Sequence, residues 1–282
     1  MKALFDNHSK VASRKVTRMY STSFYAGVKA LDYAIRDDIH AIYGFVRFAD
    51  EIVDTFHDFD KKVLLEEFTR DTKLAIERRI SMNPILNSFQ FTVNKYNVDI
   101  ELIDQFLHSM RMDLGDMEYD QASYEEYILG SAEVVGLMCL KVFVYGDEEK
   151  YQKLKPYAMK LGSAFQKINF LRDLKDDFNE LGRIYFPHLD AGELSLENKL
   201  SIEEEIQKEF DEALIGIKML PKSSRFGVYV SYKYYTKLLK KIKKKTAQDL
   251  MKERIRVSNN TKLLVFAKSY LCLLYTSPSP RD

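Results

Sequence analysis

Apolar residues recur at intervals of three and four along most of this 282-residue chain. One series is Ile39, Ile42, Tyr43 and Val46, and another runs through residues 154–170. This spacing places apolar side chains on one face of an α-helix. Alternating strand patterns closed by Asn-Gly or Asp-Gly turns are missing from the sequence. The chain is therefore predicted to be all-α, with eight to ten helices and no internal repeat.

Proline is scarce, and its positions mark pauses in the helical pattern. The internal prolines are predicted to separate helices: Pro84, Pro156, Pro187 and Pro221. The chain ends in a run rich in serine and proline, which resembles a vector- or assembly-derived scar. We therefore expect residues 1–274 to form one helical domain and residues 275–282 to be a non-native or disordered tail.

The composition supplies a core and argues against several function classes. Hydrophobic residues make up 46% of the chain, so disorder is not expected. The 43 basic and 42 acidic side chains give a formal net charge of +1, which does not suggest nucleic-acid binding. The run KKIKKK at 240–245 is interpreted as a solvated helix face, and a basic rim that attracts anionic substrate or lipid headgroups is the alternative.

Cysteine usage and hydropathy predict a cytoplasmic location. Cys139 and Cys272 cannot form a disulfide framework, and the start MKALFDNHSK lacks the apolar segment of a secretory signal. No run approaches the roughly 20 apolar residues that a membrane-spanning helix needs. The most apolar late stretch, 263–274, is interrupted by Lys268. A packed helix is expected there, with any membrane contact peripheral and on the inner face.

Two acidic patterns stand out against this apolar background. Asp50 and Asp54 lie four residues apart, and the series Asn169, Asp173 and Asp177 repeats that interval twice. On a helix, residues at this interval share a face and lie about 6 Å apart along the axis. Carboxylates aligned in this way repel one another unless a cation compensates them. The pattern therefore predicts two helix faces that carry oxygen ligands.

The oxygen-only composition of these faces indicates a hard divalent cation. Mg²⁺ is typically held by one or two carboxylates while substrate phosphates complete its shell, and Mn²⁺ is the alternative. The His and Cys spacing of a zinc site is missing from the sequence. A single aspartate pair is common on solvated helices. Two pairs in apolar surroundings, each near an arginine, favour Mg²⁺ bound to a departing diphosphate.

Five stretches of the chain resemble the squalene/phytoene synthase family, the head-to-head prenyl diphosphate synthases of the all-α isoprenoid synthase fold. The likeness covers nearly all of residues 1–268, in the family's order and approximate spacing. It is carried by YSTSFY (20–25), YGFVRFADEIVD (43–54), YILGSAEVVGLM (127–138), QKINFLRDLKDDFNELGRIYFP (166–187) and ERIRVSNNTK (253–262). The resemblance implies one helical domain with a central cavity.

The resemblance also implies a reaction. Two allylic diphosphates bind one cavity, the first loses its diphosphate, and the double bond of the second attacks the resulting cation to give a cyclopropylcarbinyl diphosphate. A second ionisation, rearrangement and proton loss give phytoene or dehydrosqualene, whereas hydride capture from NADPH gives squalene. Such chemistry needs metal and arginine at a polar mouth and a dry, aromatic-rich cavity that shelters the cation. The 18 Phe and 18 Tyr can supply those walls.

Matching motif positions imply roles for individual residues. The implied catalytic Mg²⁺–diphosphate ligands are Asp50, Asp54, Asp173 and Asp177, with Asn169 as a further metal ligand. The residues implied to bind substrate are Ser23, Phe24, Tyr43, Arg47, Tyr127, Gln166, Asn169, Tyr235 and Arg254. Glu51 stands where the family usually has a second aspartate, and the four-residue interval is kept.

Simpler interpretations stand beside these roles. Arg47 could instead form a helix salt bridge to a neighbouring acid, and any one aromatic residue could serve core packing. Glu133 departs from the glycine-containing run usual near Tyr127, and it is either salt-bridged outside the cavity or alters helix packing. Asp113 is interpreted as a structural or helix-end acid.

The leading prediction is a phytoene synthase that condenses two geranylgeranyl diphosphates in carotenoid biosynthesis, without NADPH. The motif sequences SAEVVGLMCLKVF and RIRVS are more similar to those of bacterial phytoene synthases than to those of squalene synthases. A C15-using dehydrosqualene or squalene synthase is the alternative. A non-catalytic scaffold relative would tend to lose the aspartates, and a metal-dependent phosphohydrolase would not explain 127–138 or 253–262. The expected partners are prenyl diphosphates and downstream carotenoid enzymes.

Overall fold

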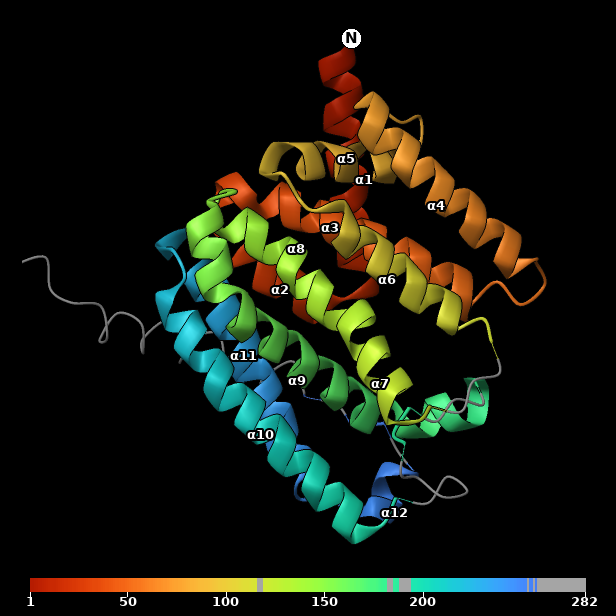
Figure 1. The fold of residues 1–282 in the computed structure, drawn as a ribbon, viewed down its shortest axis with the longest axis vertical. Coiled ribbons are helices and arrows are strands. Elements are labelled where there is room, and N and C mark those ends of the chain that lie inside the picture. The colour runs from red at the N-terminus through yellow and green to blue at the C-terminus, as the bar shows by residue number, and fades with distance from the viewer. Residues whose placement is uncertain (116–118, 182–184, 188–193, 253, 256, 258–282) are drawn as a thin grey trace, which may run out of the picture.

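The computed structural model describes residues 1–115, 119–181, 185–187, 194–252, 254, 255 and 257, with the backbone alone for residues 176–181. Regular structure within these residues consists of twelve α-helices and one π-helical turn, without β-strands (Figure 1). The elements are α1 (Lys2–Tyr20), α2 (Thr22–Lys29), α3 (Tyr33–Asp54), α4 (Lys61–Arg78), α5 (Pro84–Tyr96), α6 (Ile100–Met112), α7 (Gln121–Ile128), the π-turn η1 (Leu129–Glu133), α8 (Val134–Phe143), α9 (Glu148–Leu181), α10 (Leu196–Met219), α11 (Lys222–Ile242) and α12 (Ala247–Leu250).

The all-α prediction is confirmed, whereas eight to ten helices was too few. Ser21 has an extended backbone and accepts a hydrogen bond from the backbone N–H of Phe24, so it ends α1 and begins α2. Pro84 opens α5 behind the capping residue Asn83. Helix boundaries therefore follow local capping chemistry that apolar periodicity does not reveal.

Pro156 lies inside α9 and does not separate two helices as predicted. The helix begins earlier, because the Asp147 carboxylate accepts from the backbone N–H of Lys150 and caps the first turn. Tyr151 and Leu154, just before the proline, are buried, so packing offsets the one backbone hydrogen bond that proline cannot donate. A single long helix results, and it forms one wall of the site described below.

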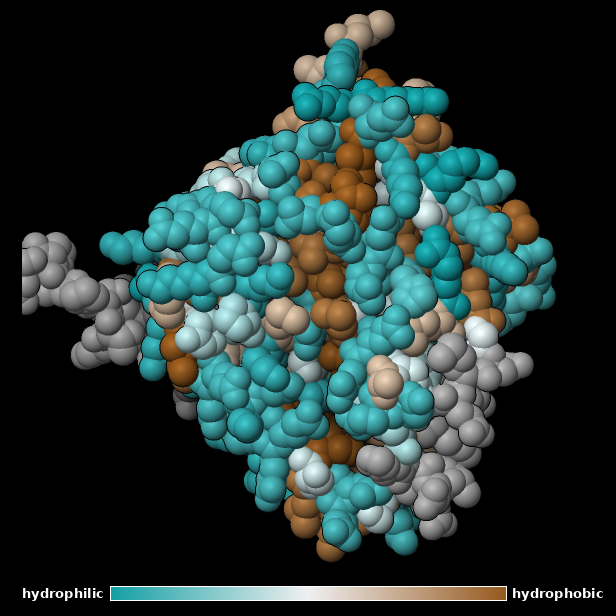
Figure 2. Space-filling model, in the orientation of Figure 1, coloured by the Kyte–Doolittle hydropathy of each residue, from teal (hydrophilic) through white to brown (hydrophobic). Residues whose placement is uncertain are grey.

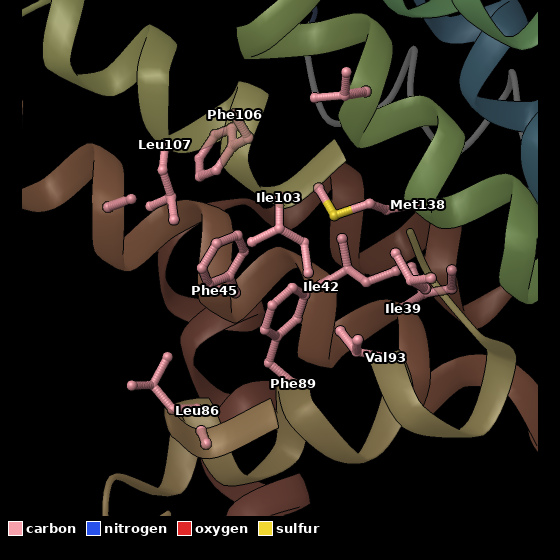
Figure 3. Packing of buried hydrophobic residues seen from close by; sticks show 14 of the residues in the cluster. Ile39, Ile42, Phe45, Leu86, Phe89, Val93, Ile103, Phe106, Leu107 and Met138 are labelled. Atoms are coloured by element: carbon pink, nitrogen blue, oxygen red, sulfur yellow. The ribbon is translucent and has the colours of Figure 1, made fainter. Parts of the chain in front are cut away.

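The core is divided into clusters that surround a central space. The first cluster joins α3, α5, α6 and α8, and the rings of Phe45 and Phe89 stack 4.0 Å apart at its centre (Figure 3). The second cluster joins α9, α10 and α11 through buried residues such as Ile168, Phe210 and Leu238. A third, smaller cluster closes the end where α8 turns into α9.

The helices are arranged so that the N-terminal and C-terminal parts of the chain face each other. The long helix α9 runs beside α10 in the lower half of Figure 1, and the start of α1 projects from the top. On the face shown in Figure 2 hydrophilic residues predominate, with apolar residues visible in a narrow central band. None of the described helices combines the length and apolar character needed to cross a bilayer.

Candidate active site

The first acidic face lies at the end of α3. The helix is capped by Asp32, whose carboxylate accepts from the backbone N–H of Ala34 at 2.9 Å. Tyr43 and Val46 of this helix line a central cavity, and Asp50 follows Val46 after one helical turn. Asp50 and Asp54 are both partly buried. The structure therefore places the predicted aspartate pair beside the cavity.

The electrostatic environment of Asp50 opposes its negative charge. Burial raises the pKa of Asp50 to about 7, and the nearby Asp54 carboxylate raises it further. The Arg47 guanidinium acts in the opposite direction, and Asp113 adds a smaller increase. A partly buried carboxyl group in this position would gain from a bound cation.

The second acidic face lies on α9. Gln166 and Asn169 line the same cavity, and Asp173 follows after one more turn. The Tyr235 hydroxyl donates to Asn169 Oδ1 at 3.2 Å, and the Tyr235 ring stacks on Phe165 at 3.9 Å. Tyr235 of α11 therefore fixes the amide of Asn169 at the edge of the cavity.

Asp173 is held by two arginines. Arg172 Nε donates to Asp173 Oδ1 at 2.8 Å, and Arg254 Nε lies 2.7 Å from the same oxygen. Arg254 Nη2 donates to Asp173 Oδ2 at 3.2 Å, and Arg172 also contacts that oxygen. Hydrogen bonding to Asp173 raises the pKa of Arg172. The side chain of Asp177 lies outside the described residues.

Residues next to the two acidic faces approach each other at one end of the cavity, which we call the mouth. Burial raises the pKa of Tyr43 to about 12, and the Asp50 carboxylate and Tyr235 hydroxyl both contribute to the rise. Tyr43 of α3 is therefore close to Tyr235 of α11, which bonds Asn169 of α9. Phe24 stacks on Tyr43 at 4.8 Å and also lines the cavity. Polar groups from both acidic helices thus border a single opening.

The cavity behind this mouth has a volume of about 300 Å³ and an apolar wall. Its lining comes from α2, α3, η1, α8, α9, α10 and α11. At its deep end Leu140, Leu154 and Leu220 are buried in the third core cluster. From Leu154 to Asn169 α9 lines the cavity over a rise of roughly 22 Å, at about 1.5 Å per residue.

Glycines let the helices of this wall approach closely. A Cβ atom on Gly162 of α9 would lie 2.7 Å from the carbonyl oxygen of Ala132 in η1. A Cβ atom on Gly216 of α10 would lie 2.3 Å from Tyr157 Cβ. Both glycines border the cavity, so its width depends on how closely the helices pack where glycine has no side chain.

Three predicted substrate residues have other surroundings in the structure. Arg47 Nε donates to Glu51 Oε2 at 3.1 Å, which is the helix salt bridge considered from the sequence, and its guanidinium lies 4.5 Å from the Tyr20 ring. Ser23 is partly exposed and is not part of the cavity lining. Tyr127 is buried, also away from that lining, and its hydroxyl donates to Asp113 Oδ2 at 2.8 Å.

Asp113 and Arg172 lie beside predicted site residues, and the sequence analysis assigned neither of them to the site. The Asp113 carboxylate accepts hydrogen bonds from the hydroxyls of Tyr127 and, at 3.4 Å, Tyr185. Its negative charge raises the pKa of Asp50. It lies far from both acidic patterns in sequence, so spacing gave no signal. Arg172 directly precedes Asp173, so it does not belong to the four-residue series of Asn169, Asp173 and Asp177 on which the prediction was based.

The donor set fits Mg²⁺. The side chains at the mouth offer carboxylate and amide oxygens, which this ion prefers, and a cation would offset the burial and the repulsion by Asp54 that raise the pKa of Asp50. Within the described part of the chain, no three His, Cys, Asp or Glu side chains are grouped closely enough to hold a metal. Mg²⁺ needs no such group where phosphate oxygens complete its shell.

Comparisons with known proteins agree with this geometry. The family model described as squalene/phytoene synthase matches residues 17–261. Phytoene synthase 2, chloroplastic, of Solanum lycopersicum is 29% identical over 287 residues, which cover 91% of this chain and 88% of the relative. Presqualene diphosphate synthase of Rhodopseudomonas palustris is 27% identical over 168 residues, covering 59% of this chain and 58% of the relative.

Solved structures show the same fold. A dehydrosqualene synthase in complex with ligand matches with a TM-score of 0.79 at 18% identity, over 96% of this chain and 98% of that one. Squalene synthase HpnC of Alicyclobacillus acidocaldarius matches with a TM-score of 0.73 at 20% identity, over 84% and 94%. The fold is therefore the all-helical isoprenoid synthase fold, as predicted. Because the family model spans most of its length, the chain belongs to the squalene/phytoene synthase family.

Proposed function

We propose that this protein condenses two geranylgeranyl diphosphates head to head to give phytoene, through a cyclopropylcarbinyl diphosphate. Membership of a family of head-to-head prenyl diphosphate condensing enzymes supports the reaction class. The similarity to plant phytoene synthases supports the C20 substrate. The observation that carries the proposal is a deep apolar cavity whose mouth is bordered by polar groups of both acidic helices.

The span of the cavity lining along α9 is long enough for a C20 chain. An extended hydrocarbon advances about 1.3 Å per carbon, because each C–C bond of about 1.5 Å is tilted to the chain axis. The main chain of a geranylgeranyl group therefore reaches roughly 20 Å, and that of a farnesyl group roughly 15 Å. The residues of α9 that line the cavity, from Leu154 to Asn169, span roughly 22 Å, at about 1.5 Å per residue.

The chain's own residues then have distinct tasks. Mg²⁺ held by Asp50, Asp54, Asn169 and Asp173 would neutralise the diphosphate and make it a better leaving group. Gln166 lies at the mouth, where its amide can orient the diphosphate. The stacked rings of Phe165 and Tyr235 line the cavity and can stabilise a carbocation through their faces. The apolar wall below them excludes water that would capture the cation.

Purified protein supplied with Mg²⁺ and geranylgeranyl diphosphate should release diphosphate and form a C40 hydrocarbon. Asp50→Asn should reduce turnover by at least about a hundredfold with unchanged helical circular dichroism, because it removes one ligand charge. Asp71→Asn, an exposed aspartate on α4, is the matched control and should keep normal rates. A C30 product from farnesyl diphosphate alone would instead support the C15 alternative and overturn the choice of substrate.

A further inference from the structure

Asp173 is a predicted metal ligand whose carboxylate is engaged by two cationic side chains. Each of its two oxygens contacts both the Arg172 guanidinium and the Arg254 guanidinium. Carboxylate oxygens paired in this way with planar guanidinium groups form strong, charge-assisted hydrogen bonds. A divalent cation could coordinate Asp173 only by displacing one of these partners.

The two arginines differ in how easily they can leave. Arg172 belongs to α9 itself, neighbours Asp173 directly, and has a side chain that is 21% exposed. Arg254 follows α12, and its side chain is 41% exposed, so water and dissolved anions can reach it. Ile255 and Val257 beside it are buried in the second core cluster, which keeps the backbone of this segment near the mouth. Arg254 is therefore the exchangeable partner.

We propose that Arg254 and a divalent cation compete for the Asp173 carboxylate, so that metal binds this face tightly only when a diphosphate draws Arg254 away. This inference rests on the proposed function, because it takes Asp173 as a metal ligand and a diphosphate as the anion. Arg172 stays in place and keeps the carboxylate oriented.

The physical basis is a linked equilibrium. A carboxylate already occupied by Arg254 is available to metal for a small fraction of the time, and the apparent metal association constant is the intrinsic constant multiplied by that fraction. A diphosphate offers Arg254 a bidentate partner of higher charge, so the arginine moves to it and Asp173 becomes free for the cation. Substrate and metal binding are thereby coupled, and the coupling is reciprocal.

The test titrates Mn²⁺ into the protein without diphosphate, followed by electron paramagnetic resonance of free Mn²⁺. Arg254→Gln should bind Mn²⁺ about tenfold more tightly than the wild type, because the competing charge-assisted pair is gone. The double variant Arg254→Gln with Asp173→Asn should lose this gain. Lys252→Gln removes the same charge from an exposed neighbour and should leave the affinity unchanged.

A second arm titrates inorganic diphosphate without metal, and Arg254→Gln should bind it about tenfold more weakly than the wild type. Loss of diphosphate affinity with unchanged Mn²⁺ affinity would show that Arg254 is an anion ligand alone and would overturn the competition. Arg254→Lys keeps the charge but cannot form two parallel hydrogen bonds. Its Mn²⁺ and diphosphate affinities should lie between those of the wild type and Arg254→Gln, and it replaces the glutamine variant if that variant does not fold.

The failure of this inference is distinguishable from that of the proposed function. A wild type that forms C40 hydrocarbon, combined with unchanged Mn²⁺ affinity in Arg254→Gln, overturns the competition only. A wild type that forms no C40 product while Arg254→Gln gains Mn²⁺ affinity keeps the competition and overturns the substrate assignment.

Discussion

Glu133 is a charged residue whose surroundings favour its neutral form. It ends the π-turn η1, where burial raises the pKa of its carboxyl to about 7 and the Glu209 carboxylate raises it further. Lys160 and Lys167 lower it, although Lys167 Nζ lies 2.8 Å from Glu209 Oε1. Of the two sequence interpretations, the structure agrees with altered helix packing, because Glu133 belongs to an irregular helical turn, and it lies outside the cavity lining.

The pH dependence of stability should report this residue. The folded protein holds the Glu133 proton more tightly than the unfolded chain, whose pKa is near 4.5. Its contribution to the unfolding free energy is therefore fully present below pH 4.5 and is lost as the pH rises through about 7. Between urea unfolding at pH 5 and at pH 8, Glu133→Gln should lose about 1 to 3 kcal/mol less than the wild type.

The matched control for this measurement is Glu66→Gln, an exposed position on α4, which should follow the wild-type curve. A Glu133→Gln variant that loses as much stability as the wild type over this range would contradict the raised pKa. Asp50, whose pKa is raised in the same direction, acts equally in both proteins and drops out of the difference.

Single residues could be predicted where helix geometry is local. The four-residue interval predicted that Asp50 and Asp173 each lie one turn beyond a residue that lines the cavity, Val46 and Asn169, because the interval depends only on helical rise and twist. The pairing of Arg254 with Asp173 and that of Tyr127 with Asp113 join segments far apart in the chain or depend on side-chain rotamers. Nothing in residue spacing contains that information.

Among the elements, the contact between η1 and α9 should be especially sensitive to volume. Gly162→Ala would place Cβ 2.7 Å from the backbone oxygen of Ala132, which cannot rotate away as a side chain could. Alanine is otherwise preferred over glycine in a helix by roughly 0.5–1 kcal/mol. We nevertheless expect a loss of about 1 to 3 kcal/mol in the unfolding free energy, measured by urea denaturation.

Lys153→Ala, an exposed position on the same helix, should change stability by less than about 0.5 kcal/mol. If Gly162→Ala were as stable as this control, the close approach of the two helices would not be essential. The contact between Gly162 and Ala132 could not be predicted from the sequence, because apolar periodicity predicts helices but not where two helices cross. The π-turn and the interior Pro156 were missed for the same reason, because packing overrides local preference there.

For the molecule as a whole, the depth of the cavity should determine substrate length. Ala158 lines the wall roughly 16 Å below Asn169, at about 1.5 Å per residue. Ala158→Phe should obstruct the cavity at that level and lower kcat/KM for geranylgeranyl diphosphate at least about tenfold relative to farnesyl diphosphate. Met159→Phe adds an aromatic ring at the next position, outside the cavity lining, and should keep the wild-type ratio. An unchanged ratio in Ala158→Phe would show that chains do not extend that far.

The buried leucines at the deep end of the cavity bear on how substrate would enter and product would leave. Within the described residues, Leu140, Leu154 and Leu220 line the end of the cavity that is farthest from Asn169 and pack together in the third core cluster. In the proposed reaction, we therefore expect the substrates to enter and the hydrocarbon product to leave through the same mouth, beside the predicted metal ligands. Release of diphosphate would empty this mouth, so we expect the hydrocarbon to leave last in each catalytic cycle.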